Sequence, residues 1–120
     1  MADEHGKFGG NADLSWCLNR SRSRQGLLVL AHGAGAGMDH ANMTALALAV
    51  AHVGFDVFRF NFPFTQAGRK RVDSKSVSTA TIEAAVSHAQ MLSPGGQLLL
   101  GGHSFGGRMA SHAYSSTNWA

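Results

Sequence analysis

Several residue types are scarce in this chain, and each scarcity excludes a class of protein or a kind of site. A single cysteine, Cys17, excludes an internal disulfide and a cysteine-rich metal site. No apolar run is long enough to cross a membrane. The N-terminal segment Met1–Gly6 is acidic and lacks the basic start and apolar core of a signal peptide. We therefore expect a cytoplasmic protein.

Charge is also sparse, since only 14% of the residues are charged and the net charge is +3. The basic residues gather in two clusters, Arg20 with Arg22 and Arg24, and Arg69–Arg71 with Lys75. Both clusters lie in polar segments without interleaved aromatic residues, which favours solvated loops over a nucleic-acid surface. No Gly-Lys-Ser or Gly-Lys-Thr sequence occurs, so a Walker-type phosphate loop is excluded.

The residues that are present describe one globular domain over residues 1–120. Short apolar runs at 27–31, 55–62 and 97–101 predict buried strands, and helical patterns cover about 43–51, 76–92 and 104–114. This alternation predicts an α/β fold, a three-layer sandwich around a mostly parallel sheet. Residues 1–26 are expected to form a weakly ordered strand or hairpin region with a short strand at 14–18.

Local signals place the ends of these elements. Asp39 or Asn42 is expected to cap the first helix, and Gly54 to end it. Pro63 is expected to stop the second strand, and residues 64–75 to form a long basic loop.

The pattern Gly102-x-Ser104-x-Gly106 is the motif in this chain that indicates a catalytic serine. It joins an apolar strand to a helix, as a nucleophile elbow does. Side chains two residues before and after the serine would collide in so sharp a turn, and the two glycines avoid this. The helix N-terminus adds partial positive charge where an oxyanion would form. Ser104 is therefore the candidate nucleophile; a tight glycine-rich turn with an idle serine is the alternative.

A second glycine-rich loop, His32–Gly37, follows the first buried strand. Such a loop can supply one N–H of an oxyanion hole, here Ala34 or Gly35, and Phe105 after the serine supplies the other. The competing interpretation is a dinucleotide fingerprint. Met38 stands where its third glycine belongs, and no acid ends the next strand, although Arg59 could take the 2′-phosphate of NADP.

An acid and a base for Ser104 are hard to find. No acidic residue follows it, and the only later histidine, His112, lies too far along the same helix. His40 is the least improbable base in the chain, because the loop that carries it passes the site. His103 is adjacent to Ser104 but points away from it. Among the acids, Asp56 begins its strand at the wrong edge of the sheet. The histidines show no metal-ligand spacing, so we expect no metal and no cofactor.

Three blocks of sequence carry a family resemblance: residues 28–40, 59–64 and 101–111. With these blocks the chain resembles a family of small, dienelactone-hydrolase-like α/β-hydrolase-fold proteins. The group that the chain resembles also includes the hydrolase-like domain of NSL complex subunit three and testis-expressed protein thirty. The resemblance implies the α/β-hydrolase fold, Ser104 as nucleophile and an oxyanion site at Ala34 and Phe105.

Two departures from the family qualify the expected function. His103 stands where the family usually has lysine, and family members continue beyond position 120 with the triad acid and histidine. We expect the N-terminal part of a serine hydrolase for a small acyl substrate with an ester, thioester or amide bond. The alternative is an inactive hydrolase fragment or an interaction module. An open apolar edge at 97–101 would promote self-association.

Overall fold

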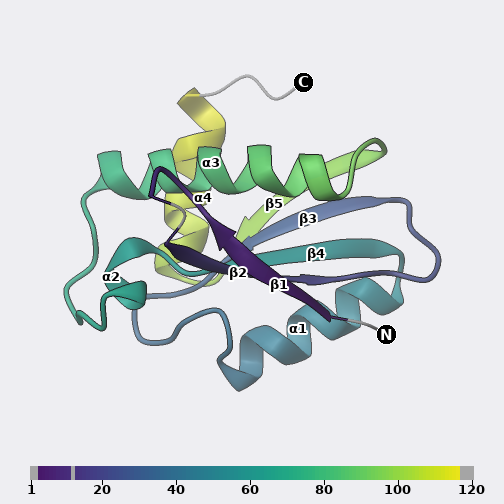
Figure 1. Ribbon diagram of the computed structural model, residues 1–120, viewed down its shortest axis with the longest axis horizontal. Coiled ribbons are helices and arrows are strands. Elements are labelled where there is room, and N and C mark those ends of the chain that lie inside the picture. The colour runs from purple at the N-terminus through teal and green to yellow at the C-terminus, as the bar shows by residue number, and fades with distance from the viewer. Residues whose placement is uncertain (1–2, 12, 117–120) are drawn as a thin grey trace.

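The computed structural model describes residues 3–11 and 13–116 and contains one five-stranded sheet with helices on both faces (Figure 1). The expected domain 1–120 also includes residues 1, 2, 12 and 117–120, which lie outside the described part. Along the chain the elements are β1 (Asp3–Phe8), β2 (Leu14–Asn19), β3 (Gly26–Ala31), α1 (Ala41–His52), β4 (Phe55–Phe60), α2 (Pro63–Gln66), α3 (Lys75–Leu92), β5 (Gln97–Gly102) and α4 (Phe105–Ser116).

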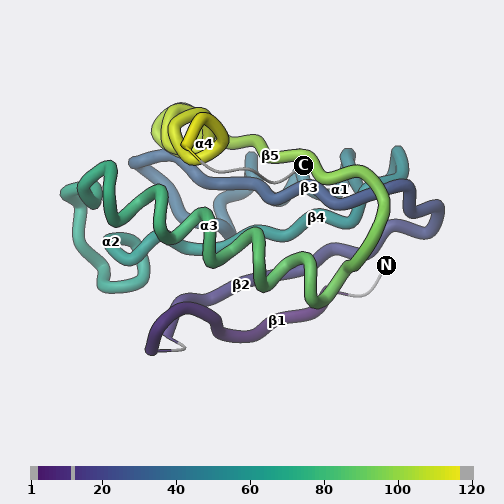
Figure 2. Tube along the Cα trace, turned by 90° about the horizontal axis from the view of Figure 1, so that it is seen from above, coloured from purple at the N-terminus to yellow at the C-terminus, as the bar shows by residue number. Residues whose placement is uncertain are grey.

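The sheet order is β1-β2-β4-β3-β5, so the hairpin of β1 and β2 and the strand β5 form opposite edges (Figure 2). Strands β3, β4 and β5 are parallel, whereas β1 pairs with β2 and β2 with β4 in antiparallel register. The three predicted strands and the strand at 14–18 are confirmed. The sheet is mixed because the N-terminal hairpin extends it beyond β4.

Two hydrophobic clusters form the layers on either side of the sheet. Helix α1 covers one face, where Met43 and Ala47 pack against Leu30 and Val57. Helices α3 and α4 cover the other face over a larger core rich in phenylalanine. Two faces buried beneath helices explain why β3 is continuously apolar in sequence. Strand β4 is mostly apolar but also buries the charged side chains of Asp56 and Arg59. The predicted three-layer arrangement is confirmed.

Two local expectations need correction, and a third is confirmed. The N-cap of α1 is His40, whose Nδ1 accepts from the N–H of Asn42, and neither Asp39 nor Asn42 provides the cap. Pro63 does follow the end of β4, but it also opens the short helix α2 inside the expected loop, because proline suits a first helical position. Gly54, with φ of 121°, follows the C-cap of α1 as predicted.

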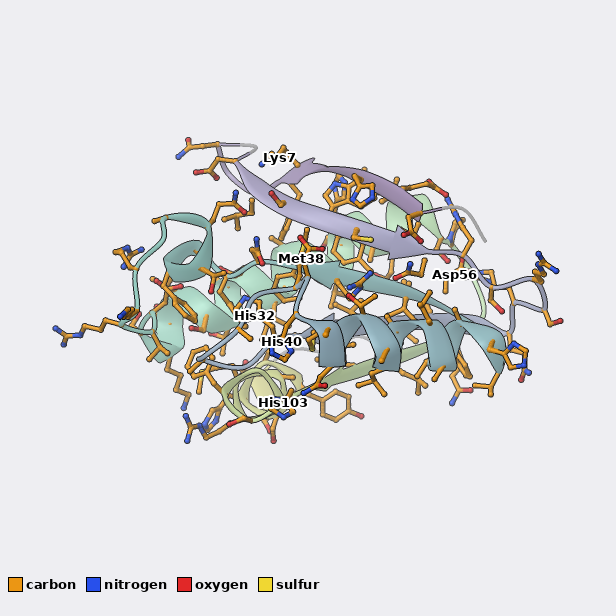
Figure 3. The ribbon with its side chains drawn as sticks, turned by 90° about the horizontal axis from the view of Figure 1, so that it is seen from below. Lys7, His32, Met38, His40, Asp56 and His103 are labelled. Atoms are coloured by element: carbon orange, nitrogen blue, oxygen red, sulfur yellow. The ribbon has the colours of Figure 1, made fainter. Side chains whose placement is uncertain are left out.

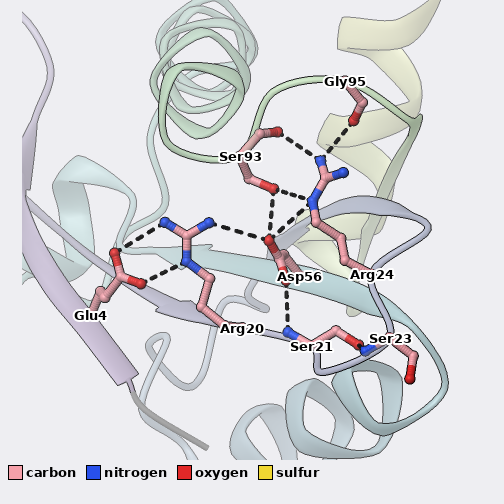
Figure 4. Close-up of polar contacts among 8 residues, drawn as sticks. All are labelled: Glu4, Arg20, Ser21, Ser23, Arg24, Asp56, Ser93 and Gly95. Atoms are coloured by element: carbon pink, nitrogen blue, oxygen red, sulfur yellow. Dashed lines mark hydrogen bonds and ion pairs between the residues drawn. The ribbon is translucent and has the colours of Figure 1, made fainter.

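The basic cluster at 20–24 is also different from expectation, because two of its arginines are bound to a buried carboxylate (Figure 4). Asp56, only 1% exposed, pairs with Arg24 at 3.2 Å and with Arg20 at 3.4 Å. Its oxygens also accept from the N–H of Ser21 at 2.7 Å and from the hydroxyl of Ser93 at 2.8 Å. This network joins the amino end of β4 to the segments before β3 and after α3.

Candidate active site

Ser104 lies in the two-residue turn, His103 and Ser104, between the end of β5 and the start of α4. Its φ is 53°, and among the described residues no other non-glycine residue has a positive φ. A serine in this left-handed region is strained, and such strain persists where the surrounding structure enforces it. The backbone of the turn is held because His103 N–H donates to Ala31 at 3.0 Å and Arg108 N–H to Ser104 at 3.0 Å.

The glycines that flank Ser104 are required by close packing of backbone on backbone. A Cβ at Gly102 would lie 2.4 Å from the carbonyl carbon of Gly106. A Cβ at Gly106 would lie 2.4 Å from the oxygen of His32 and 2.5 Å from that of Ala31. Helix α4 therefore starts in direct contact with the carboxyl end of β3, as the elbow pattern requires.

The loop after β3 lies against this turn. A Cβ at Gly33 would lie 3.0 Å from Nδ1 of His103 and 3.7 Å from Cβ of Ser104. A pocket of about 350 Å³ opens here and is lined by Gly33, Ala34, Gly35, Ala36, His40, Asn42, Met43, Leu46, His103 and Ser104. The predicted nucleophile and Ala34 thus share one cavity. Phe105 is the first residue of α4, so its N–H has no carbonyl partner within the helix.

The side chain of His32 stabilises the loop after β3 through hydrogen bonds of its ring. Its ring is fully buried, with Nδ1 2.7 Å from the oxygen of Gly33, while the N–H of Phe62 donates to Nε2 at 3.0 Å. A ring that accepts at Nε2 carries its proton on Nδ1, so His32 is neutral and donates to Gly33. Burial lowers the pKa of this imidazole and keeps it neutral. Sequence patterns missed this role because the contact with Phe62 is tertiary.

Aromatic packing fixes the start of α4. The ring of Phe105 lies 5.4 Å from that of Phe62 and 5.8 Å from that of Phe64, both in edge-to-face geometry. The ring of His32 contacts Phe62 at 5.0 Å in the same way. The segment after β4 therefore supports both the loop and the turn that carries Ser104.

The structure restricts the candidate bases. His40 and His103 line the pocket with Ser104. Because Nδ1 of His40 accepts from Asn42, the neutral ring carries its proton on Nε2 and can donate but not accept there. This geometry argues against His40 as the base. Asp56 lies at the opposite end of the sheet from His32, His40 and His103 (Figure 3), which agrees with its expected position.

Dinucleotide binding through the first loop is disfavoured by the position of Arg59. This side chain is 2% exposed, and its guanidinium donates to the carbonyl of Met38 and the hydroxyl of Thr44, each at 2.9 Å. It is therefore not available to bind the 2′-phosphate of NADP.

The parallel strands, the glycine-bounded turn at Ser104 and the adjoining loop define an α/β-hydrolase type of fold. A family model described as an alpha/beta hydrolase domain matches residues 24–120. The chain belongs to this alpha/beta hydrolase domain family. A search of curated proteins finds no match, and the kinship with NSL complex subunit three stays a prediction.

Solved structures share the fold at low sequence identity. A serine hydrolase without a lid from Xanthomonas campestris matches at 20% identity and a TM-score of 0.79, over 96% of this chain and 56% of its own. A serine hydrolase homologue from Coxiella burnetii matches at 22% identity and a TM-score of 0.80, over 98% of this chain and 60% of its own. A dienelactone hydrolase from Anabaena variabilis matches at 15% identity and a TM-score of 0.75, over 96% of this chain and 57% of its own. The chain thus spans somewhat more than half the length of these structures.

None of the helices in the described ranges 3–11 and 13–116 has both the length and the apolar character needed to span a membrane.

Proposed function

We propose that the chain is the nucleophile-bearing part of a serine hydrolase that cleaves an ester, thioester or amide bond of a small acyl substrate. The Oγ of Ser104 attacks the carbonyl carbon, and the N–H groups of Ala34 and Phe105 stabilise the oxyanion. Collapse of the tetrahedral intermediate breaks the bond to the alcohol, thiol or amine, and water then releases the acyl group. The observation that carries the proposal is the φ of 53° at Ser104 beside the loop Gly33–Ala36.

In such a hydrolase the acid and the base of the triad would lie outside the described residues. His40 is not suited to take the proton of Ser104 because its tautomer carries a proton on Nε2. His112 is not suited because it lies along α4, the helix that starts directly after Ser104. The same point favours the second candidate function, an inactive hydrolase fragment or interaction module. Both versions keep the expected cytoplasmic location, with no cofactor and with neither nucleic acid nor membrane as partner.

Labelling with a fluorophosphonate probe distinguishes the two candidates. We expect the folded chain to be labelled to one equivalent, because the oxyanion donors still accelerate attack when a triad member is missing. Labelling should be lost in Ser104→Ala and retained in Ser111→Ala, which removes an exposed hydroxyl from the same helix. Folded wild-type chain that takes up no probe would identify the inactive alternative.

We further propose that the open edge of β5 pairs with a second copy of the chain. Gln97 and His103 donate their N–H groups toward β3, to Gln25 and Ala31, so alternation points those of Leu98 and Leu100 outward. No charged residue occurs in β5, whereas the other edge strand, β1, carries Asp, Glu, His and Lys side chains. An apolar groove of about 430 Å³ lies between β5 and α4 and adds surface for self-pairing.

A charge on the edge tests this association. Leu99→Lys places a cation on a partly exposed position of β5 and should shift sedimentation of the chain toward the monomer. Leu48→Lys makes the same change at an exposed site on α1 and should leave association unchanged. A wild-type chain that sediments as a single monomeric species across concentrations would contradict the pairing.

A further inference from the structure

Three side chains with different ligand atoms meet on one face of the N-terminal hairpin. The register of β1 and β2 places His5 directly opposite Cys17, and Asp3 lies two residues from His5 on the same face. The carboxylate oxygen, the imidazole nitrogen and the thiol sulfur lie within 4.8 Å of one another. This convergence depends on strand pairing, so the spacing of residues along the chain does not reveal it.

The ligand types fit one class of ion. Zinc binds cysteine sulfur at about 2.3 Å, and histidine nitrogen and carboxylate oxygen at about 2.0–2.2 Å, in tetrahedral geometry. Ligand atoms around one such ion lie less than about 4 Å apart. Asp3 and His5 are exposed and can close the remaining gap, whereas Cys17 is buried and fixed.

Neighbouring donors already orient two of the three ligands. The amide nitrogen of Asn19 donates to Oδ1 of Asp3 at 2.5 Å, and Nη2 of Arg59 donates to Sγ of Cys17 at 3.3 Å. The same Nη2 donates to Oδ1 of Asn19 at 3.0 Å, so a single network supports both ligands. Groups of this kind hold metal ligands in place and are a regular part of metal sites.

Arg59 gives the site an electrostatic reason to hold a thiolate. Its guanidinium is buried, and no ion pair to it occurs within residues 3–11 and 13–116. A cysteine that coordinates zinc is deprotonated, and its proton passes to solvent. The thiolate of Cys17 would then accept a charge-assisted hydrogen bond from Arg59, while Asp3 and Cys17 together balance the two positive charges of the ion.

We propose that Asp3, His5 and Cys17 bind one Zn²⁺ ion, with the fourth position open to water. The site clamps β1 to β2, because two ligands come from β1 and one from β2. The zinc site is separate from Ser104. Its residues lie on the hairpin of β1 and β2, where Cys17 and Asn19 pair with Arg59 and Val57 of β4. Ser104 instead follows the carboxyl end of β5.

Cobalt titration of the full chain tests the site, with Co²⁺ as a spectroscopic substitute for zinc. Because Cys17 is the only cysteine, a sulfur-to-cobalt charge-transfer band reports this residue alone. We expect one equivalent of Co²⁺ to saturate the band and Zn²⁺ to displace it. Cys17→Ser should abolish the band, and His5→Gln and Asp3→Asn should each weaken binding at least about tenfold. The control His52→Gln, at the exposed end of α1, should bind as wild type does.

Two results overturn the proposal. One is the absence of a charge-transfer band in the wild-type chain at several equivalents of Co²⁺. The other is a band of unchanged affinity in both His5→Gln and Asp3→Asn, which would indicate an adduct of the cysteine alone. These two substitutions are at exposed positions, so they test the site even if Cys17→Ser fails to fold.

Discussion

Replacing Asp56 with alanine is expected to lower the free energy of unfolding by about 3 kcal/mol. The carboxylate is 1% exposed and accepts from two arginines, a serine hydroxyl and a backbone N–H (Figure 4). Without it, the N–H of Ser21 and the hydroxyl of Ser93 lose their acceptor. The side chains of Arg20 and Arg24 are 38% and 28% exposed, so water solvates them in part, and the expected loss stays at the low end of values for buried pairs.

Urea denaturation measures this loss, with two variants for comparison. Asp39→Ala removes the same charge from an exposed position and should change stability little. Asp56→Asn keeps the size and one acceptor oxygen, and should cost about 1–2 kcal/mol. If Asp56→Ala and Asp39→Ala unfold at the same urea concentration, the network is not a determinant of stability.

The parallel core of the fold could be predicted because its signals are local. Strands buried on both faces, such as β3, are continuous apolar runs, and the glycines around Ser104 mark a turn that only small residues permit. Strand β1 could not be predicted in the same way. Its sequence, DEHGKF, has no apolar run, and it forms a strand because it pairs in register with β2.

The supporting contacts were beyond prediction for a related reason, which is distance along the sequence. Arg20 and Arg24 look like solvated cations until the fold brings Asp56, more than thirty positions away, beside them. His32 looks like any buried histidine until the segment after β4 places the N–H of Phe62 against its ring. The turn at Ser104 and the loop after β3 were therefore predictable, while the groups that hold them in place required the tertiary structure.

The largest effect on the candidate site itself is expected from Gly102→Ala. The added methyl group would lie 2.4 Å from the carbonyl carbon of Gly106 and 2.5 Å from the nitrogen of Gly107. Both are backbone atoms at the start of α4, so relief requires the helix to move away from β5. We expect a loss of about 3 kcal/mol in unfolding free energy, at the upper end of overpacking costs, and loss of probe labelling at Ser104.

Gly101→Ala provides the matched control, one residue earlier in the same strand. A Cβ there would meet only Cδ1 of Leu28, at the ordinary contact distance of 3.6 Å. This variant should be as stable as wild type or slightly more so, because alanine reduces the freedom of the unfolded chain. The comparison separates a general intolerance of side chains in β5 from a specific collision with α4. Equal stability of the two variants would mean that α4 does not pack against Gly102, and the geometric case for Ser104 as a nucleophile would fail with it.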